Sequence, residues 1–156
     1  GVLMKSFLKL CGFIFIITSF TLAGDVEDIK NQILKNNEYS KINNQSVNEY
    51  SKDGALEFWS SGGLIQRIPP DGRPDEYDYI NLKYKHIEII ILEPKKAAIA
   101  MYYSEGSMKP KNLPAISHYM TRVTQAYVKE NGEWRVRASH WSPILGGTGT
   151  NQTSIE

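Results

Sequence analysis

Residues 120–143 read MTRVTQAYVKENGEWRVRASHWSP and contain two strand-like runs on either side of a tight turn. The turn is Asn131-Gly132, the strongest hairpin signal in the chain, because both residue types readily adopt positive φ. The flanking runs extend over 116–129 and 133–144. This stretch therefore predicts a final hairpin of two long antiparallel strands.

Three more strands are predicted upstream of this hairpin. The run at 83–92 is rich in isoleucine, and a turn at 93–96 separates it from a strand over 97–107. A shorter strand is predicted at 55–59. Prolines and glycines interrupt 64–79, which predicts an irregular loop there. Such a loop is either the rim or lid of a binding site or a tolerated surface loop.

Helical patterns precede the strands. Over 25–39 one apolar stripe at helical spacing predicts a helix, and its members are Val26, Ile29, Ile33 and Leu34. The stretch Ser46-Val47-Asn48-Glu49 matches a capping box and predicts a second, short helix that includes Tyr50. Helices followed by a meander of antiparallel strands predict an α+β architecture.

The chain opens with the pattern of a secretory signal peptide. Two lysines precede an apolar run over 10–20 and a small-residue exit at 21–23. The run is shorter than the ~20 apolar residues that a membrane crossing needs, although an uncleaved anchor is the alternative. We therefore predict a signal peptide over 1–23, with residues 1–3 ahead of its start at Met4. The protein is then exported, and is periplasmic or secreted.

Loss of the predicted signal leaves a nearly neutral chain without cysteine. The sequence has 18 basic and 17 acidic residues, and two of the lysines lie in the signal. The single cysteine, Cys11, lies there too, so the core of the exported chain has no disulfide to support it. No basic stripe or polybasic face is present. Nucleic acid and, after cleavage, a membrane surface are therefore not expected as partners.

The final hairpin resembles the last two strands of SnoaL-like domains in the nuclear-transport-factor-2-like superfamily. The matching residues are a strand threonine, a Val-Lys-x-x-Gly-x-Trp turn and a closing histidine and serine, here Thr124, Val128, Lys129, Gly132, Trp134, His140 and Ser142. Phe58-Trp59 and the strand at 98–106 are similar to that family too. We assign a SnoaL-like domain to 24–145 and a flexible, glycine-rich tail to 146–156.

The resemblance implies an α+β fold in which N-terminal helices pack on a strongly curved antiparallel sheet and form a cone with a pocket. Homodimers are common among such domains. The run at 87–92 is apolar on both faces, so a second copy is expected to cover its convex side. The resemblance names no reaction, because this fold hosts isomerases, epoxide hydrolases, cyclases, dehydratases and non-catalytic assembly domains.

Strand alternation limits which side chains of the hairpin share a face. One numbering parity comprises Val123, Gln125, Tyr127, Arg135, Arg137, Ser139 and Trp141. The other comprises Arg122, Thr124, Ala126, Val128, Trp134, Val136, Ala138 and His140. Sequence alone leaves open which parity faces inward. By resemblance to a kinase association domain, Gln125 and Trp141 replace two pocket-facing arginines, so no arginine-lined anion site is carried over.

A small-molecule ligand is the expected partner, and its contacts are expected to come from aromatic and polar strand residues. The candidates are Trp59, Tyr102, Tyr103, Arg122, Gln125, Tyr127, Arg137 and Trp141. Each aromatic residue could equally belong to the core, which is the commoner fate of a strand aromatic.

Two side chains are candidates for acid–base catalysis. Glu105 lies beside two tyrosines, and burial would raise the pKa of its carboxyl. His140 has an ordinary pKa near working pH. For each residue the alternative is a solvated or structural position on a strand. The three histidines lack metal-ligand spacing, so no metal is expected, and no cofactor is expected either. No isomerase-type Tyr/Asp pair aligns, which argues against that reaction.

These observations predict an exported small-molecule-binding domain with an apolar or aromatic pocket. One alternative is a cofactor-free lyase, isomerase or hydrolase in which Glu105 or His140 acts beside Arg122 or Arg137. The other is a non-catalytic assembly domain that uses only the face of its sheet.

Overall fold

The computed structural model describes residues 24–144 and 146–149, so the predicted signal at 1–23 lies outside the described residues. Within them a helix over 24–43 precedes six strands. The strands are β1 (Ala55–Phe58), β2 (Gln66–Ile68), β3 (Tyr77–Glu93), β4 (Ala97–Pro110), β5 (Ile116–Glu130) and β6 (Glu133–Pro143). Of the predicted tail only 146–149 are described, and Thr148 there forms a bridge with Tyr119 of β5.

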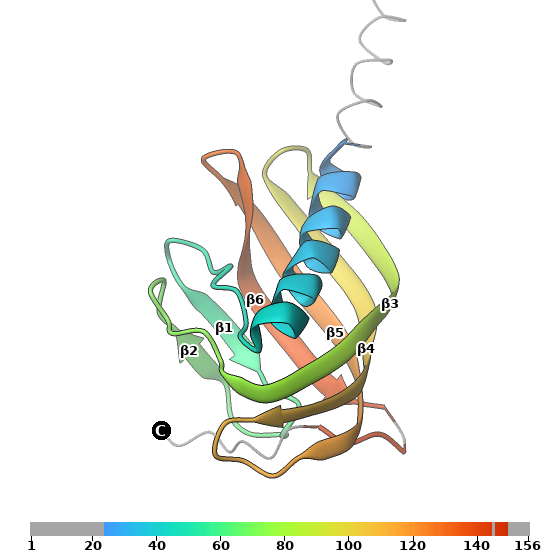
Figure 1. Ribbon diagram of the computed structural model, residues 1–156. Coiled ribbons are helices and arrows are strands. Elements are labelled where there is room, and N and C mark those ends of the chain that lie inside the picture. Colours follow the sequence, from blue (N-terminus) through green and yellow to red (C-terminus); the bar gives the residue numbers. More distant parts are fainter. Residues whose placement is uncertain (1–23, 145, 150–156) are drawn as a thin grey trace, which may run out of the picture.

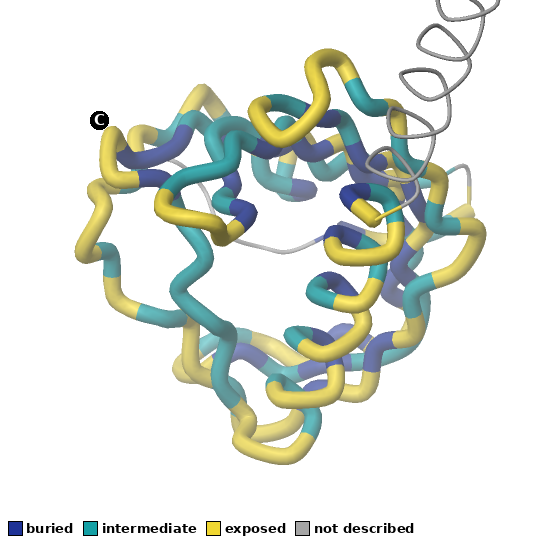
Figure 2. Tube along the Cα trace, turned by 90° about the horizontal axis from the view of Figure 1, so that it is seen from above, coloured by how far each residue is buried: buried dark blue, intermediate teal, exposed yellow. Residues whose placement is uncertain are grey.

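The strands form one strongly curved sheet in the order β2-β1-β6-β5-β4-β3, and the sheet bends around the helix (Figure 1). This is the predicted α+β cone. Neighbouring strands from β6 to β3 are antiparallel, whereas β1 pairs with β6 in parallel, so the sheet is mixed rather than wholly antiparallel. Seen from above, the buried parts of the strands face the helix (Figure 2).

The core lies between the helix and the concave side of the sheet. Ile29 and Ile33 of the helix pack against Ala100, Val123 and Val136, all of which are buried. Burial of an aliphatic side chain of this size contributes about 1.5–3 kcal/mol. No helix in the described part of the chain has both the length and the hydropathy for a bilayer crossing.

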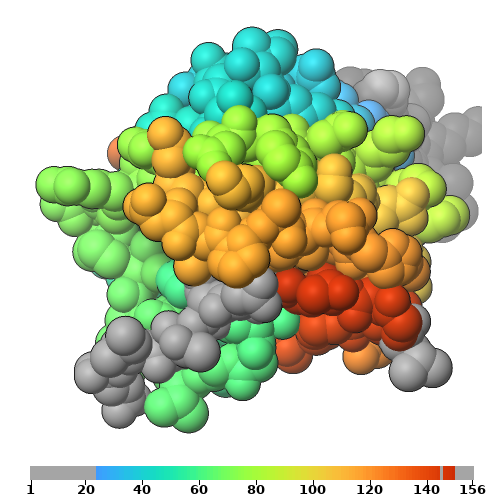
Figure 3. All heavy atoms as spheres, turned by 60° about the horizontal axis from the view of Figure 1, so that its bottom comes forward, coloured from blue at the N-terminus to red at the C-terminus, as the bar shows by residue number. Residues whose placement is uncertain are grey.

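Polar contacts fix the helix over the sheet. The buried carboxylate of Asp25 accepts hydrogen bonds from Lys129 Nζ at 2.9 Å and from the backbone N–H of Lys95 at 2.7 Å. About three turns further along, Asn37 Nδ2 donates to the carbonyl of Leu82 in β3 at 3.2 Å. Figure 3 shows the helix and β3 in direct contact at this end of the molecule. The helix is therefore held at two points along its length.

The short helix predicted at 46–50 is not formed. The Ser46 hydroxyl accepts a hydrogen bond from the backbone N–H of Asp75 at 2.8 Å, and the Glu49 carbonyl accepts one from β6 at 2.8 Å. The Glu49 carboxylate, expected to cap the helix, accepts a hydrogen bond from Asn36 Nδ2 at 2.6 Å instead. A local cap stabilises a helix by only about 1 kcal/mol, so these tertiary contacts outweigh it.

A bulge in β6 changes which of its residues face the core. Ala126 pairs with Ala138 while Tyr127 pairs with Val136, which leaves Arg137 as an extra residue. The expectation that inward-facing and outward-facing residues alternate without a break along β6 is therefore wrong. Inward-facing residues come from both numbering parities, namely Trp134, Val136, Ser139 and Trp141.

A second irregularity lies in β4. The register of β4 against β5 shifts after Gly106, which has φ = 145°. A Cβ atom at this position would lie 2.1 Å from the carbonyl oxygen of Asn81 in β3. Only glycine allows the two strands to approach this closely.

Candidate functional site

A cavity of about 150 Å³ lies between the helix and the concave side of the sheet. Its wall includes residues from the helix, from 46–50, from the loop before β3 and from five strands. The pocket expected inside the cone is therefore present. The helix and segments far apart in the sequence all contribute to it.

Aromatic rings form much of the cavity wall. The lining aromatics are Tyr50, Trp59, Tyr77, Tyr84, Tyr102, Tyr119, Tyr127 and Trp141. The ring centroids of Tyr84 and Tyr102 are 5.0 Å apart, and Trp141 meets Tyr102 edge-on at 6.2 Å. Burial raises the pKa of Tyr84, Tyr102 and Tyr127, so these side chains are neutral phenols at physiological pH.

Gln125 joins two of these tyrosines to a carboxylate. Its Oε1 accepts a hydrogen bond from Tyr102 at 2.9 Å and one from Tyr127 at 2.8 Å. Because both hydroxyls donate to the oxygen, the amide nitrogen is free to hydrogen-bond with Glu49. The network therefore connects β4 and β5 to the segment before β1.

Glu49 is a half-buried carboxyl group at the edge of this network. Loss of water around the group raises its pKa to about 7, and the charge of Glu57 acts in the same direction. Hydrogen bonds from Asn36 and Gln125 oppose the shift without cancelling it. Glu49 therefore changes its charge near neutral pH.

Two further carboxylates line the cavity. Glu57 is buried and accepts hydrogen bonds from Trp59 Nε1 at 3.0 Å and from the Ser139 hydroxyl. Asp75 is exposed at the edge of the cavity, and partial loss of water together with the charge of Glu57 raises its pKa. Among the described residues, none donates a hydrogen bond to the Asp75 carboxylate.

The charged side chains that line the cavity are all acidic. Glu49, Glu57 and Asp75 contribute to it, whereas no lysine, arginine or histidine of the described residues does. These carboxylates do not converge as metal ligands. Across residues 24–144 and 146–149, no group of three or more His, Cys, Asp or Glu side chains is arranged to hold a metal ion.

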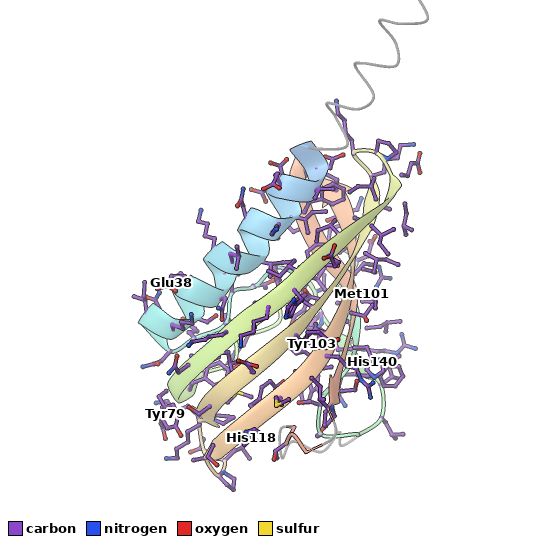
Figure 4. The ribbon with its side chains drawn as sticks, turned by 90° about the vertical axis from the view of Figure 1, so that its right-hand side faces the viewer. Glu38, Tyr79, Met101, Tyr103, His118 and His140 are labelled. Carbon is purple, nitrogen blue, oxygen red and sulfur yellow. The ribbon has the colours of Figure 1, made fainter. Side chains whose placement is uncertain are left out.

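The structure brings some of the predicted ligand-binding residues to the cavity and not others. Those that line it are Trp59, Tyr102, Gln125, Tyr127 and Trp141. Arg122 is exposed and donates to the Ser142 hydroxyl at 2.9 Å, and Arg137 donates to the carbonyl of Gly54 at 3.3 Å. Tyr103 lies on the convex side of the sheet, as Figure 4 shows.

Neither predicted catalytic residue reaches the cavity. Glu105 forms an ion pair with Lys85, which lowers the pKa of its carboxyl rather than raising it. His140 is exposed on the convex side of the sheet, where its ring packs edge-on against Phe58 at 5.6 Å (Figure 4). Their placement gives these two residues no access to a ligand in the cavity.

Several cavity residues were not among the predicted site residues. The capping-box pattern predicts that Glu49 caps a helix, so its position in the cavity wall was not predicted. Asp75 and Tyr77 lie within the stretch 64–79 that was predicted as a loop, for which a rim was one of two open interpretations, and they line the cavity as a rim would. Asn37 lies on the helix with no distinguishing pattern around it. No signal in a single sequence would have identified Asn37.

The fold and the cavity of the described residues define an α+β cone with an internal pocket lined by tyrosines. A similar solved structure is that of an NTF2-like protein of unknown function from Prochlorococcus marinus (Prochlorococcus sp. NATL2A). It is 15% identical, with 67% of this chain and 77% of that chain covered and a TM-score of 0.45. No protein-family model matches the chain, and no curated protein is similar to it in sequence.

Proposed function

We propose that the chain is an exported small-molecule-binding domain of the SnoaL-like, nuclear-transport-factor-2-like type. The observation that carries the proposal is the cavity of about 150 Å³ with its aromatic and polar lining. Protein cores are packed almost without voids, so a space of this size is a feature that a purely structural core would lack. Concave, mostly apolar sites with a few polar groups are typical of small-molecule binding.

The cavity volume limits the ligand to a small compound. An apolar cavity of about 150 Å³ in another protein holds a benzene ring. The ligand here therefore has on the order of six non-hydrogen atoms within the cavity. A longer compound would extend past Asp75 at its edge.

A cofactor-free enzyme is less well supported by the geometry. Glu105 and His140 both lie away from the cavity. A general acid or base would have to come from the lining itself, where Glu49 has a pKa of about 7. The side chains that hydrogen-bond to Glu49, Asn36 and Gln125, are neutral amides that do not transfer protons, so binding is the function we favour.

Native mass spectrometry tests the binding function. We expect the purified protein to carry an excess mass on the order of 100 Da that disappears when the same sample is denatured. The denatured run is the control, because a covalent modification would persist in it. A native mass equal to the chain mass, together with no stabilisation by any small organic compound tested, would contradict the proposal.

We propose further that the protein is a homodimer whose copies meet through the convex side of the sheet. That side carries exposed apolar residues on neighbouring strands, including Ile90, Leu92, Met101 (48% exposed) and Tyr103 (45% exposed). The inner residues of the same β3 run, Ile87, Ile89 and Ile91, already pack on the core. Contiguous exposed apolar surface of this kind is typical of a protein–protein contact.

Light scattering coupled to size-exclusion chromatography tests the dimer. Met101→Lys would place a charge in the interface, so the variant is expected to elute as a monomer where the wild type gives twice the chain mass. Ile42→Lys is the matched control, because Ile42 is also apolar and exposed but lies on the helix. A monomeric wild type, or equal masses for both variants, would exclude an interface on the convex side.

A further inference from the structure

We infer that the ligand of the cavity is a small protonated amine with an apolar body. The inference rests on the proposed binding function and adds to it the chemical class of the ligand. Three features of the lining carry the inference: the sign of its charges, an unsatisfied acceptor, and the arrangement of its aromatic rings.

The first feature is the uncompensated negative charge. Three carboxyl groups line the cavity, and no cationic side chain of the described residues shares it with them. Trp59 and Ser139 donate hydrogen bonds to the Glu57 carboxylate, and Asn36 donates one to Glu49, but all of these donors are neutral. A buried or partly buried charge is costly without a counter-ion. A cationic ligand would supply that counter-ion.

The second feature is Asn37, which lines the cavity and is 6% exposed. Its Nδ2 donates to the Leu82 carbonyl, which fixes the orientation of the amide because a carbonyl can only accept. The Oδ1 atom is buried and receives no hydrogen bond from the described residues. An unsatisfied buried acceptor costs about 1–3 kcal/mol. A ligand that donates a hydrogen bond, as an ammonium group does, would remove this cost, whereas a carboxylate ligand would not.

The third feature is the aromatic wall. The faces and edges of Tyr84, Tyr102 and Trp141 approach one another at 5.0–6.5 Å between centroids. Aromatic faces attract cations, and rings grouped around a space recognise organic ammonium groups. The same rings accommodate the apolar body of the amine. A hydrated metal ion would gain nothing from them, and the carboxylates are not arranged as metal ligands.

Three probes with one carbon skeleton separate charge from shape. Isopentylamine, isopentanol and isovalerate carry cationic, neutral and anionic heads, and each is measured by calorimetry against the complete chain at pH 8. An aliphatic amine is protonated at that pH, as lysine is. We expect isopentylamine to bind at least about tenfold more tightly than isopentanol. Isovalerate is expected not to bind.

A pair of variants in one loop tests the contribution of charge. Asp75→Asn removes a carboxylate that holds no hydrogen bond in the described structure, so its fold should be preserved. We expect about fivefold weaker binding of isopentylamine and unchanged binding of isopentanol. Asp71→Asn is the control, because Asp71 lies in the same loop and does not line the cavity. Its amine affinity is expected to match that of the wild type.

The outcomes distinguish this inference from the proposed function. Equal binding of amine and alcohol, or preferred binding of isovalerate, overturns the amine inference and leaves small-molecule binding intact. The same holds if none of the three binds while the native protein carries another ligand. If none binds and the native mass is that of the chain alone, both the inference and the proposed function fail.

Discussion

Replacing Gly106 with alanine is expected to lower the free energy of unfolding by at least ~4 kcal/mol, enough to leave little folded protein. The position has φ = 145°, a region in which side chains are strained. The added Cβ would also lie 2.1 Å from the carbonyl oxygen of Asn81, a backbone atom that cannot rotate away. Relief of that contact would require β3 and β4 to separate where they pair.

Thermal unfolding followed by circular dichroism measures this effect, and Gly132→Ala is the matched control. Gly132 also has positive φ, at 87°, but a Cβ there meets nothing within 4 Å. The control should therefore lose only about 1 kcal/mol, the cost of the backbone conformation alone. Similar losses for the two variants would show that the close approach of β3 to β4 is not the constraint.

The second large effect is expected from Glu49→Gln, which should stabilise the protein strongly at pH 8 and by less than ~1 kcal/mol at pH 5. The folded-state pKa of Glu49 is about 7, above its ordinary value of 4.5. A carboxyl group with a raised pKa favours folding below pH 4.5, and that contribution is lost as the pH rises through 7. At pH 8 the charge of Glu49 therefore costs on the order of 3 kcal/mol.

The groups that face Glu49 support this sign. Asn36 and Gln32 on the helix and Gln125 on β5 are neutral, and the charge of Glu57 on β1 repels it. Glutamine keeps the shape of the protonated acid and can still accept a hydrogen bond from Asn36. Removal of the charge therefore removes only the desolvation and repulsion costs.

Melting curves at pH 5 and pH 8 measure the difference. The melting temperature of Glu49→Gln should exceed that of the wild type by on the order of 5–10 °C at pH 8 and by only about 2–3 °C at pH 5. Glu38→Gln is the control, because Glu38 is exposed on the outer side of the helix (Figure 4) and should show no such dependence. Equal curves for wild type and Glu49→Gln at both pH values would mean that water solvates Glu49 in the folded protein.

The parts of the fold that sequence could predict are those with strong local signals. Asn131 and Gly132 form the predicted turn with φ values of 51° and 87°, and the strands on either side extend as expected. The apolar stripe containing Ile29 and Ile33 predicts the face of the helix that packs on the sheet. In these places local preference and tertiary packing favour the same structure.

The site could be predicted only in part, because its geometry depends on non-local pairing. Tyr102 and Gln125, two of the predicted ligand-binding residues, line the cavity because alternation along β4 and β5 is regular on either side of them. Glu49 was misassigned because a capping pattern is local, whereas backbone pairing with β6 settles its position. Contacts between residues far apart in the sequence produce no periodic pattern in the sequence from which they could be predicted.

The bulge at Arg137 has a consequence for how this chain can evolve. Because Arg137 is the extra residue, its deletion would leave the inward-facing set unchanged, whereas loss of the bulge with all residues kept would reverse the facing of every residue between the bulge and one end of the strand. A relative whose β6 has the same length but no bulge could then present an imidazole such as that of His140 to the cavity in place of an indole such as that of Trp141. The binding chemistry of the cone could thus diverge between close relatives while its architecture stayed the same. Alignments that ignore the extra residue would match inward positions in one relative to outward positions in another.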